Sequence, residues 1–138
     1  MGFDDIVQAL DETAVVAVVT STPGGKKVAT PIWAMVIDGV PYVRSVYGAD
    51  AAWYRHVVSG RPVEFVLGDG SLAERDRTAA LELARAQVST VYVPVDDGVQ
   101  GDIDDELRRK YAGQPSSVAA MLTDAARSCT LRIEPAAG

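Results

Sequence analysis

The sequence has one cysteine, one histidine and no asparagine among its 138 residues. The lone Cys129 excludes an internal disulfide and a zinc site built from cysteines, and nothing requires an oxidising compartment. The lack of asparagine excludes N-glycosylation. The longest apolar run, residues 14–19, is too short to span a membrane, and residues 1–10 lack the basic start and apolar stretch of a signal peptide. We therefore expect a cytoplasmic protein with no membrane partner.

Charge is unevenly distributed along the sequence. The formal net charge is −6, which argues against nucleic-acid partners and anionic membranes. Residues 21–68 nevertheless contain five basic and only three acidic side chains, so the acidic excess lies elsewhere. This distribution fits either a small-anion site in that segment or a chance fluctuation. Apolar residues make up 48% of the chain, close to the globular average, and the length predicts one domain over residues 1–138, with a flexible tail at 135–138.

Short apolar segments rich in β-branched residues predict strands at 13–20, 27–38, 40–46, 63–67, 88–95 and 130–134. The dipeptide Asp38-Gly39 predicts a tight hairpin, because a type I′ turn needs positive φ at both central positions. Pro31 cannot donate to a ladder, so its strand is expected at a sheet edge or a bulge. Strands outnumber helices and are joined by hairpins, which predicts a mainly β, α+β fold with an antiparallel sheet or small barrel.

Helices are expected where apolar residues recur at helical spacing: over residues 3–10, after Asp50 to residue 59 with Gly60 as its stop, after Asp102, and after Ser116 or Ser117. In the third of these, Ile103, Leu107 and Tyr111 share one face, and Gly113 follows its end. Residues 71–87 have helix-favouring composition but also alternate in places, so the residues leave their structure open.

The acidic residues between 96 and 106 do not have EF-hand spacing, and capping plus a solvated loop explains them better than calcium. No metal site is predicted. His56 is either an acid or base near neutral pH or a partly exposed helical histidine.

The richest cluster of polar and aromatic residues runs from Lys27 to Arg55. Trp33 follows Pro31 on the same strand face, and Arg44 with Ser45 is expected near Thr30 across the hairpin. Arginine and serine suit an anion, and aromatic rings suit a planar ligand. The residues fit equally a cofactor cradle and an ordinary hairpin with a packed tryptophan. Arg44 interrupts an apolar run, so it needs an acceptor, which is either a carboxylate such as Glu64 or Asp50, or a ligand phosphate.

Four segments resemble the split-barrel flavin-binding superfamily, which includes pyridoxamine 5'-phosphate oxidase-like proteins and deazaflavin-dependent reductases: Thr30-Pro31-Ile32-Trp33, Asp38-Gly39, Tyr42-Val43-Arg44-Ser45 and Ala52-Trp53-Tyr54-Arg55. The resemblance covers residues 27–65 most clearly and is nearest an uncharacterised bacterial branch. It implies a six-stranded antiparallel split β-barrel with peripheral helices, and a strand over residues 81–95. It also implies a homodimer with FMN or a deazaflavin coenzyme at the subunit interface.

The same resemblance implies that the strand at residues 28–33 backs the isoalloxazine ring, while Arg44, Ser45 and the following helix start meet phosphate. The expected cofactor-binding residues are Lys27, Ala29, Thr30, Pro31, Ile32, Trp33, Arg44, Ser45, Gly48, Trp53, Tyr54 and Arg55. Two departures leave the cofactor's identity open. Trp53 stands where FMN-binding members commonly have Lys or Arg, and Gly48-Ala49 stands where deazaflavin reductases usually have Gly-Gly.

Two functions follow as hypotheses. The first is a flavin- or deazaflavin-dependent oxidoreductase acting on an unknown small molecule, with Tyr54 and His56 as candidate acids. The second is a non-catalytic protein that binds a flavin, heme or another planar anion. A homodimer is also expected on physical grounds: if Ile32, Ala34 and Val36 fill the barrel, then Trp33, Met35 and Ile37 form an outward apolar face for a second subunit.

Overall fold

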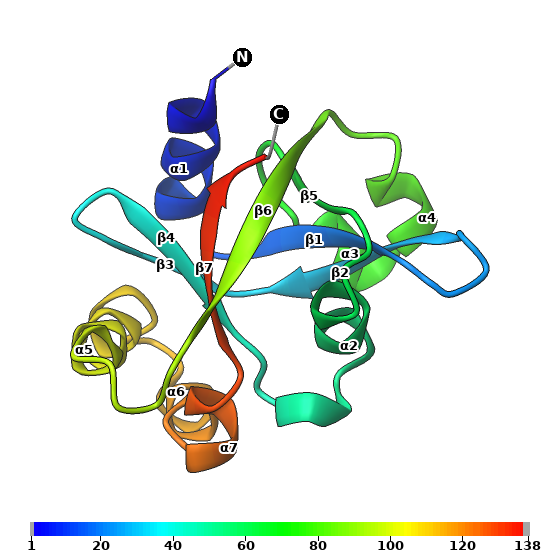
Figure 1. Ribbon diagram of the computed structural model, residues 1–138. Coiled ribbons are helices and arrows are strands. Elements are labelled where there is room, and N and C mark those ends of the chain that lie inside the picture. The colour runs from blue at the N-terminus through cyan, green and yellow to red at the C-terminus, as the bar shows by residue number, and fades with distance from the viewer. Residues whose placement is uncertain (1, 137–138) are drawn as a thin grey trace.

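A curled antiparallel sheet of seven strands forms the centre of the computed structural model, which describes residues 2–136 (Figure 1). The strand order is β2-β1-β5-β6-β7-β4-β3. The strands are β1 (Val16–Ser21), β2 (Lys27–Ile32), β3 (Ala34–Ile37), β4 (Val40–Arg44), β5 (Val63–Val66), β6 (Arg85–Val93) and β7 (Thr130–Pro135).

The two edge strands of this sheet, β2 and β3, are neighbours in sequence and are separated only by Trp33. A single residue cannot cross a flat sheet, so the sheet must curl until its two edges approach. The predicted continuous strand over residues 27–38 is therefore wrong: its first half pairs with β1 and its second half with β4. The structure therefore has seven strands where six were expected, and the difference is that the one expected strand is divided into β2 and β3. The expected antiparallel sheet and α+β class are otherwise confirmed, and where a split β-barrel was expected the structure has a curled half-barrel.

Local turn chemistry agrees with the sequence. Asp38 and Gly39 both have positive φ, at 50° and 79°, as the predicted hairpin requires. Gly60 has φ of 87° and lies just after the helix that ends at Val58, which confirms its role as a left-handed stop. Pro31 lies in β2, which pairs only with β1, so its predicted place at a sheet edge is also confirmed.

The helices lie outside the curled sheet (Figure 1). They are α1 (Phe3–Glu12), the 3-10 turn η1 (Gly48–Asp50), α2 (Ala52–Val58), α3 (Leu72–Arg75), α4 (Arg77–Ala80), α5 (Val99–Lys110), α6 (Pro115–Met121) and α7 (Asp124–Arg127). No helix among residues 2–136 is long and apolar enough to cross a membrane.

The predicted helix caps are mostly wrong. Asp50 lies in η1, and Ala51 is the N-cap of α2. Helix α5 begins at Val99, so Asp102 lies in its first turn instead of capping it. Helix α6 begins at Pro115, and proline is well suited to a first helical position because its missing N–H has no intrahelical partner there. The N-caps that the structure has, Ala51, Gly98 and Gln114, make no side-chain capping hydrogen bond, so no capping residue in the sequence marks where these helices begin.

Residues 71–84 form two one-turn helices, α3 and α4, and β6 begins at Arg85. The strand that the resemblance implied over residues 81–95 is thus confirmed for residues 85–93. Its pairing with both β5 and β7 overrides the helix-favouring composition of the segment.

The barrel interior is filled by alternate residues of its strands, among them Val18, Val43, Phe65, Leu131 and Ile133, all at most 2% exposed. Such burial stabilises the fold by roughly 1.5–3 kcal/mol per large side chain. The turn at residues 68–70 lies close to the start of β1, where the Gly70 N–H donates to the Val15 carbonyl at 2.8 Å.

The outward face of β3 is covered by the chain's own helices. Met35 is fully buried with Ile103 and Leu107 of α5, and Trp33 and Ile37 pack against the same cluster. The physical argument that this face needs a second subunit is therefore wrong, and the homodimer remains a prediction. Ala34 is fully buried in the interior cluster, as expected.

The expected flexible tail is only partly within the described residues. Pro135 is the last residue of β7, so the strand extends further than predicted. Residues 137–138 lie outside the part of the chain that the structure describes.

Candidate functional site

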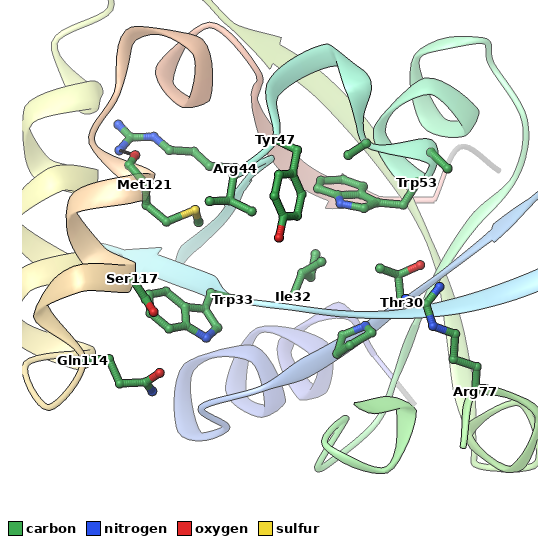
Figure 2. A pocket seen from close by; sticks show the side chains of 14 residues that line it. Thr30, Ile32, Trp33, Arg44, Tyr47, Trp53, Arg77, Gln114, Ser117 and Met121 are labelled. Atoms are coloured by element: carbon green, nitrogen blue, oxygen red, sulfur yellow. Dashed lines mark hydrogen bonds between the residues drawn. The ribbon is translucent and has the colours of Figure 1, made fainter. Parts of the chain in front are cut away.

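A pocket of about 520 Å³ opens beside the bend at Trp33, where the two sheet edges approach (Figure 2). One wall is the end of β2, made by Thr30, Pro31 and Ile32, and continues into Trp33. The pocket lies at this bend because the chain turns there from one edge strand, β2, to the other, β3.

The opposite wall comes from the segment that follows β4. Tyr47, just before η1, is 76% exposed and stands at the mouth, whereas Trp53 of α2 is 7% exposed. Ala51 and Ala52, which stand between these aromatic residues in the sequence, also line the pocket.

Trp33 is held in place by Tyr111, which follows α5. The two rings stack with their centroids 3.8 Å apart and their planes 4° from parallel. The Tyr111 hydroxyl donates to the Ala14 carbonyl at 2.7 Å and accepts from the Ala34 N–H at 3.3 Å. Burial raises the pKa of Tyr111, so the hydroxyl stays protonated and these bonds persist at neutral pH. One face of the Trp33 ring is thus covered by the protein, and the rest lines the pocket.

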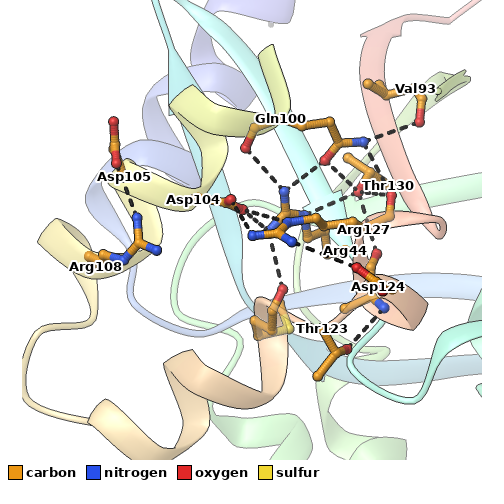
Figure 3. Close-up of polar contacts among 12 residues, drawn as sticks. Arg44, Val93, Gln100, Asp104, Asp105, Arg108, Thr123, Asp124, Arg127 and Thr130 are labelled. Carbon is orange, nitrogen blue, oxygen red and sulfur yellow. Dashed lines mark hydrogen bonds and ion pairs between the residues drawn. The ribbon is translucent and has the colours of Figure 1, made fainter. Parts of the chain in front are cut away.

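Arg44 touches the pocket, but its guanidinium points away into a polar cluster (Figures 2 and 3). The residue is 1% exposed, and each of its five N–H donors has an acceptor. These acceptors are the Thr130 hydroxyl, the Met121 carbonyl, the Asp104 carboxylate, and the carbonyl and side-chain oxygens of Gln100. Burial lowers the pKa of Arg44, and its bond to Asp104 opposes that shift. A ligand phosphate could reach this guanidinium only by displacing one of these partners.

The carboxylate that balances Arg44 is Asp104, and not Glu64 or Asp50 as proposed from the sequence. The Asp104 carboxylate lies 2.7 Å from Arg44 and 2.7 Å from Arg127. Burial alone would raise the pKa of Asp104, but the hydrogen bonds from Arg127 and Arg44 outweigh it and lower the pKa.

The members of this cluster carried a sequence signal. Gln100 and Asp104 stand at helical spacing with the core residues Ile103, Leu107 and Tyr111. Two polar residues on the buried face of an amphipathic helix indicate internal partners, whereas the acidic composition of the segment suggested a solvated loop.

Half of the expected cofactor-binding residues line the pocket: Thr30, Pro31, Ile32, Trp33, Arg44 and Trp53. Arg44 does not lie next to Thr30 in a paired strand as expected, since Thr30 pairs with Val18 and Arg44 pairs with Thr130. They meet at the pocket because the sheet curls.

The other six expected residues have different surroundings. Lys27 forms an ion pair with Glu64 on the exposed surface. Ala29 is buried in the cluster that α3 and α4 cover. The Ser45 hydroxyl donates to the Gly48 carbonyl at 2.6 Å, and Gly48 has φ of +61° beside Ala125. These two residues shape the turn into η1.

The two candidate acids also lie away from the pocket lining. Tyr54 is 7% exposed, and burial, with a smaller contribution from the nearby Cys129 thiol, raises its pKa. His56 Nδ1 is 2.9 Å from the Thr20 hydroxyl, and burial followed by the charges of Arg61 and Arg55 lowers its pKa. Arg55 itself donates to the Asp50 carbonyl at 2.6 Å on the exposed side of the helix. None of these groups is among the pocket residues.

Four lining residues come from segments that the sequence did not connect with the site. Arg77 of α4 lies at one end of the pocket, while Gln114, Ser117 and Met121 lie at the other (Figure 2). No local pattern marks them, because only the tertiary structure brings α4 and α6 to the same opening. Within residues 2–136, no group of three or more His, Cys, Asp or Glu residues is arranged to hold a metal ion.

Comparison with known proteins supports the fold. Residues 6–68 match a family described as "Uncharacterized protein conserved in bacteria (DUF2255)". A conserved hypothetical protein from Mycobacterium tuberculosis superposes with a TM-score of 0.62 at 15% identity, over 99% of this chain and 81% of that one. The heme storage protein HutZ from Vibrio cholerae gives 0.63 at 14% identity, over 97% and 89%.

A third solved structure, an FAD and heme binding protein from Mycobacterium smegmatis, gives a TM-score of 0.50 at 16% identity, covering 99% of this chain and 65% of that one. No curated protein matches the sequence. At these identities the similarity shows a shared split-barrel-like fold.

Proposed function

We propose that the pocket binds a planar aromatic ligand of the flavin or deazaflavin class. The observation that carries this proposal is the aromatic lining: Trp33, Tyr47 and Trp53 all face one pocket of about 520 Å³. This volume lies within the range of roughly 300–1,000 Å³ common for small-molecule sites. Offset stacking and edge contacts with aromatic rings favour a flat ligand over a branched one.

The polar groups around these rings fit the rest of such a ligand. Thr30, Gln114 and Ser117 offer hydrogen-bonding side chains, and Arg77 offers a positive charge. FMN has a ring edge that both donates and accepts hydrogen bonds, and a side chain that carries phosphate. The polar side chains of the lining therefore suit the ring edge, and Arg77 suits the phosphate.

When bound, a flavin or deazaflavin would supply hydride transfer, and the chain would supply binding, orientation and exclusion of water. Oxidoreductase activity toward a small molecule is accordingly the function we propose. Tyr111 contributes to it by fixing the Trp33 ring against which the ligand is placed. A second copy of the chain covering the exposed Tyr47 remains part of this proposal.

Heme is the second candidate, since two solved structures with this fold are named as heme proteins. The only histidine, His56, is not in the pocket lining, and neither is Cys129. Of the side chains that commonly hold heme iron, the lining contains only Tyr47 and Met121. This donor set is poorer than the aromatic and polar set for a flavin, so we favour the flavin class.

The protein has two tryptophans, Trp33 and Trp53, and both line the pocket. Intrinsic tryptophan fluorescence therefore reports on ligand binding at this site. We expect FMN or a deazaflavin coenzyme to quench it saturably, whereas hemin binding would be seen as a shifted Soret band. Absence of quenching by either flavin-type ligand would refute the proposal.

Tyr47→Ala is the matched test, because the residue is exposed at the mouth and its loss should not unfold the protein. We expect weaker binding by about 0.5–1.5 kcal/mol, the range for an aromatic contact. Tyr92→Ala is the control, since Tyr92 is 51% exposed on β6 and does not line the pocket. Equal effects of the two substitutions would contradict the placement of the ligand.

A further inference from the structure

The two ends of the pocket differ in charge. Arg77 stands with Thr30 at the end nearest α4, and Gln114 stands with Ser117 at the end nearest α6 (Figure 2). One end is therefore cationic and the other is neutral but polar. We propose that Arg77 and Thr30 form the phosphate subsite of the pocket, so that the ligand lies with its anionic end toward α4. This inference rests on the proposed function and adds the ligand's orientation and charge requirement.

Arg44 cannot easily serve as the phosphate-binding cation. Its five donors are already accepted by Thr130, Met121, Gln100 and Asp104. Withdrawing one donor from this buried cluster would leave an acceptor without its partner, which costs free energy. The only other positively charged residue in the pocket lining is Arg77.

Arg77 is free to bind an anion. It is exposed, and among residues 2–136 its guanidinium has no hydrogen-bond or ion-pair partner. The neighbouring Asp76 carboxylate accepts from the Ala79 N–H at 3.0 Å, so it is engaged in capping α4. A guanidinium with all its donors available can bind two phosphate oxygens at once.

Thr30 adds a second donor at the same end. Its side chain lies close to that of Arg77 in Figure 2, and the hydroxyl has no partner within the described part of the chain. Thr30 belongs to the edge strand β2, which holds it against the pocket, whereas Arg77 comes from α4 on the neighbouring surface. A hydroxyl and a guanidinium converging from two elements make a recognisable anion subsite.

The opposite end suits an uncharged ring edge. The Gln114 amide can both donate and accept, and the Ser117 hydroxyl can do the same. Neither side chain has a partner among residues 2–136. The stacked ring of Trp33 lies near them in Figure 2. An orientation with phosphate at Arg77 places the dione edge of a flavin ring next to these groups.

The test compares FMN with riboflavin, which has the same ring and lacks the phosphate. Both are titrated against tryptophan fluorescence at low salt, for wild type, Arg77→Ala and the control Arg75→Ala. Arg75 is a neighbouring exposed arginine outside the pocket lining, so it matches the long-range charge of Arg77. The deazaflavin coenzyme and its dephosphorylated form make the equivalent pair if the protein prefers deazaflavins.

We expect wild type to bind the phosphorylated ligand about five-fold or more tightly than its partner, and the preference to fall with added salt. Arg77→Ala should remove the preference while leaving riboflavin affinity unchanged, and Thr30→Val should reduce it. Arg75→Ala should retain it.

Equal affinity of wild type for FMN and riboflavin, with both binding, would overturn the subsite and leave the proposed function standing. A preference that survives Arg77→Ala would also overturn it, because another cation would then hold the phosphate. Failure of all four ligands to bind would overturn the subsite and the proposed function together. The thermal melting of each variant confirms that it is folded.

Discussion

Arg44→Ala tests whether this buried arginine is structural. The change removes five hydrogen bonds, including the ion pair to Asp104, from a site that is 1% exposed. Breaking a buried ion pair by removing one partner typically costs about 3–5 kcal/mol. Asp104 keeps its second partner, Arg127, and is 11% exposed at its side chain, so we expect the lower end of that range, about 3 kcal/mol. For a chain of this length that is a fall in melting temperature of about 10 °C.

The assay is urea unfolding followed by circular dichroism, with thermal melting alongside. Arg108→Ala is the control, because its ion pair with Asp105 is on the same helix but is 56% and 80% exposed at the two side chains. An exposed pair of this kind contributes under about 1 kcal/mol, so the control should be nearly silent. Under conditions in which both are folded, the Arg44→Ala and Arg108→Ala proteins should bind FMN with similar affinity.

The double variant Arg44→Met with Asp104→Leu sharpens the test. It replaces both charges by apolar groups of similar length, so no unpaired carboxylate remains, and part of the lost stability should return. A loss under about 1 kcal/mol for Arg44→Ala would refute the structural role. So would a large loss of ligand affinity with stability retained, because the guanidinium would then be serving the ligand.

Two further predictions concern the packing of the barrel and the titration of the buried cluster. A Cβ on Gly70 would lie 2.3 Å from backbone atoms of Val16 and Ala17, so Gly70→Ala should lower the free energy of unfolding by about 1–3 kcal/mol or more. Gly24→Ala, where the nearest atom is 3.9 Å away, should change it by under about 0.5 kcal/mol in urea unfolding, and equal effects would contradict the close approach. The lowered pKa of Asp104 means that its stabilisation is complete above its ordinary pKa of about 4 and is lost as the pH falls through the lower folded value. Asp104→Asn should therefore flatten the acid limb of stability measured between about pH 2 and 6, and an unchanged limb would refute the assignment.

Much of the local structure could be predicted from the sequence. The Asp38-Gly39 turn, the helix stop at Gly60 and the edge position of Pro31 each follow from the backbone restrictions of one or two residues. The apolar face of α5 follows from helical spacing in the same way. These features depend on neighbours in the chain, so the sequence is sufficient to predict them.

The aromatic part of the candidate site was also partly accessible. Trp33, Trp53 and the end of β2 were expected to meet a planar ligand, and the structure places them around one pocket. The basis for expecting them was a resemblance together with the composition of one segment. That basis could not separate Trp53, which lines the pocket, from Tyr54, which does not, because the two residues are neighbours in the same short helix.

Only the tertiary structure decided where strand 27–38 divides and which groups meet Arg44 and the pocket. A strand has the same alternation of side chains whichever strand pairs with it, so the sequence could not show that residues after Trp33 change partners. Asp104 pairs with Arg44, although the two residues are far apart in the chain. Arg77 and Gln114 are also distant in the sequence, yet both line the same pocket. Spatial proximity of this kind arises from the curling of the whole sheet and the packing of helices onto it, and no local pattern records it.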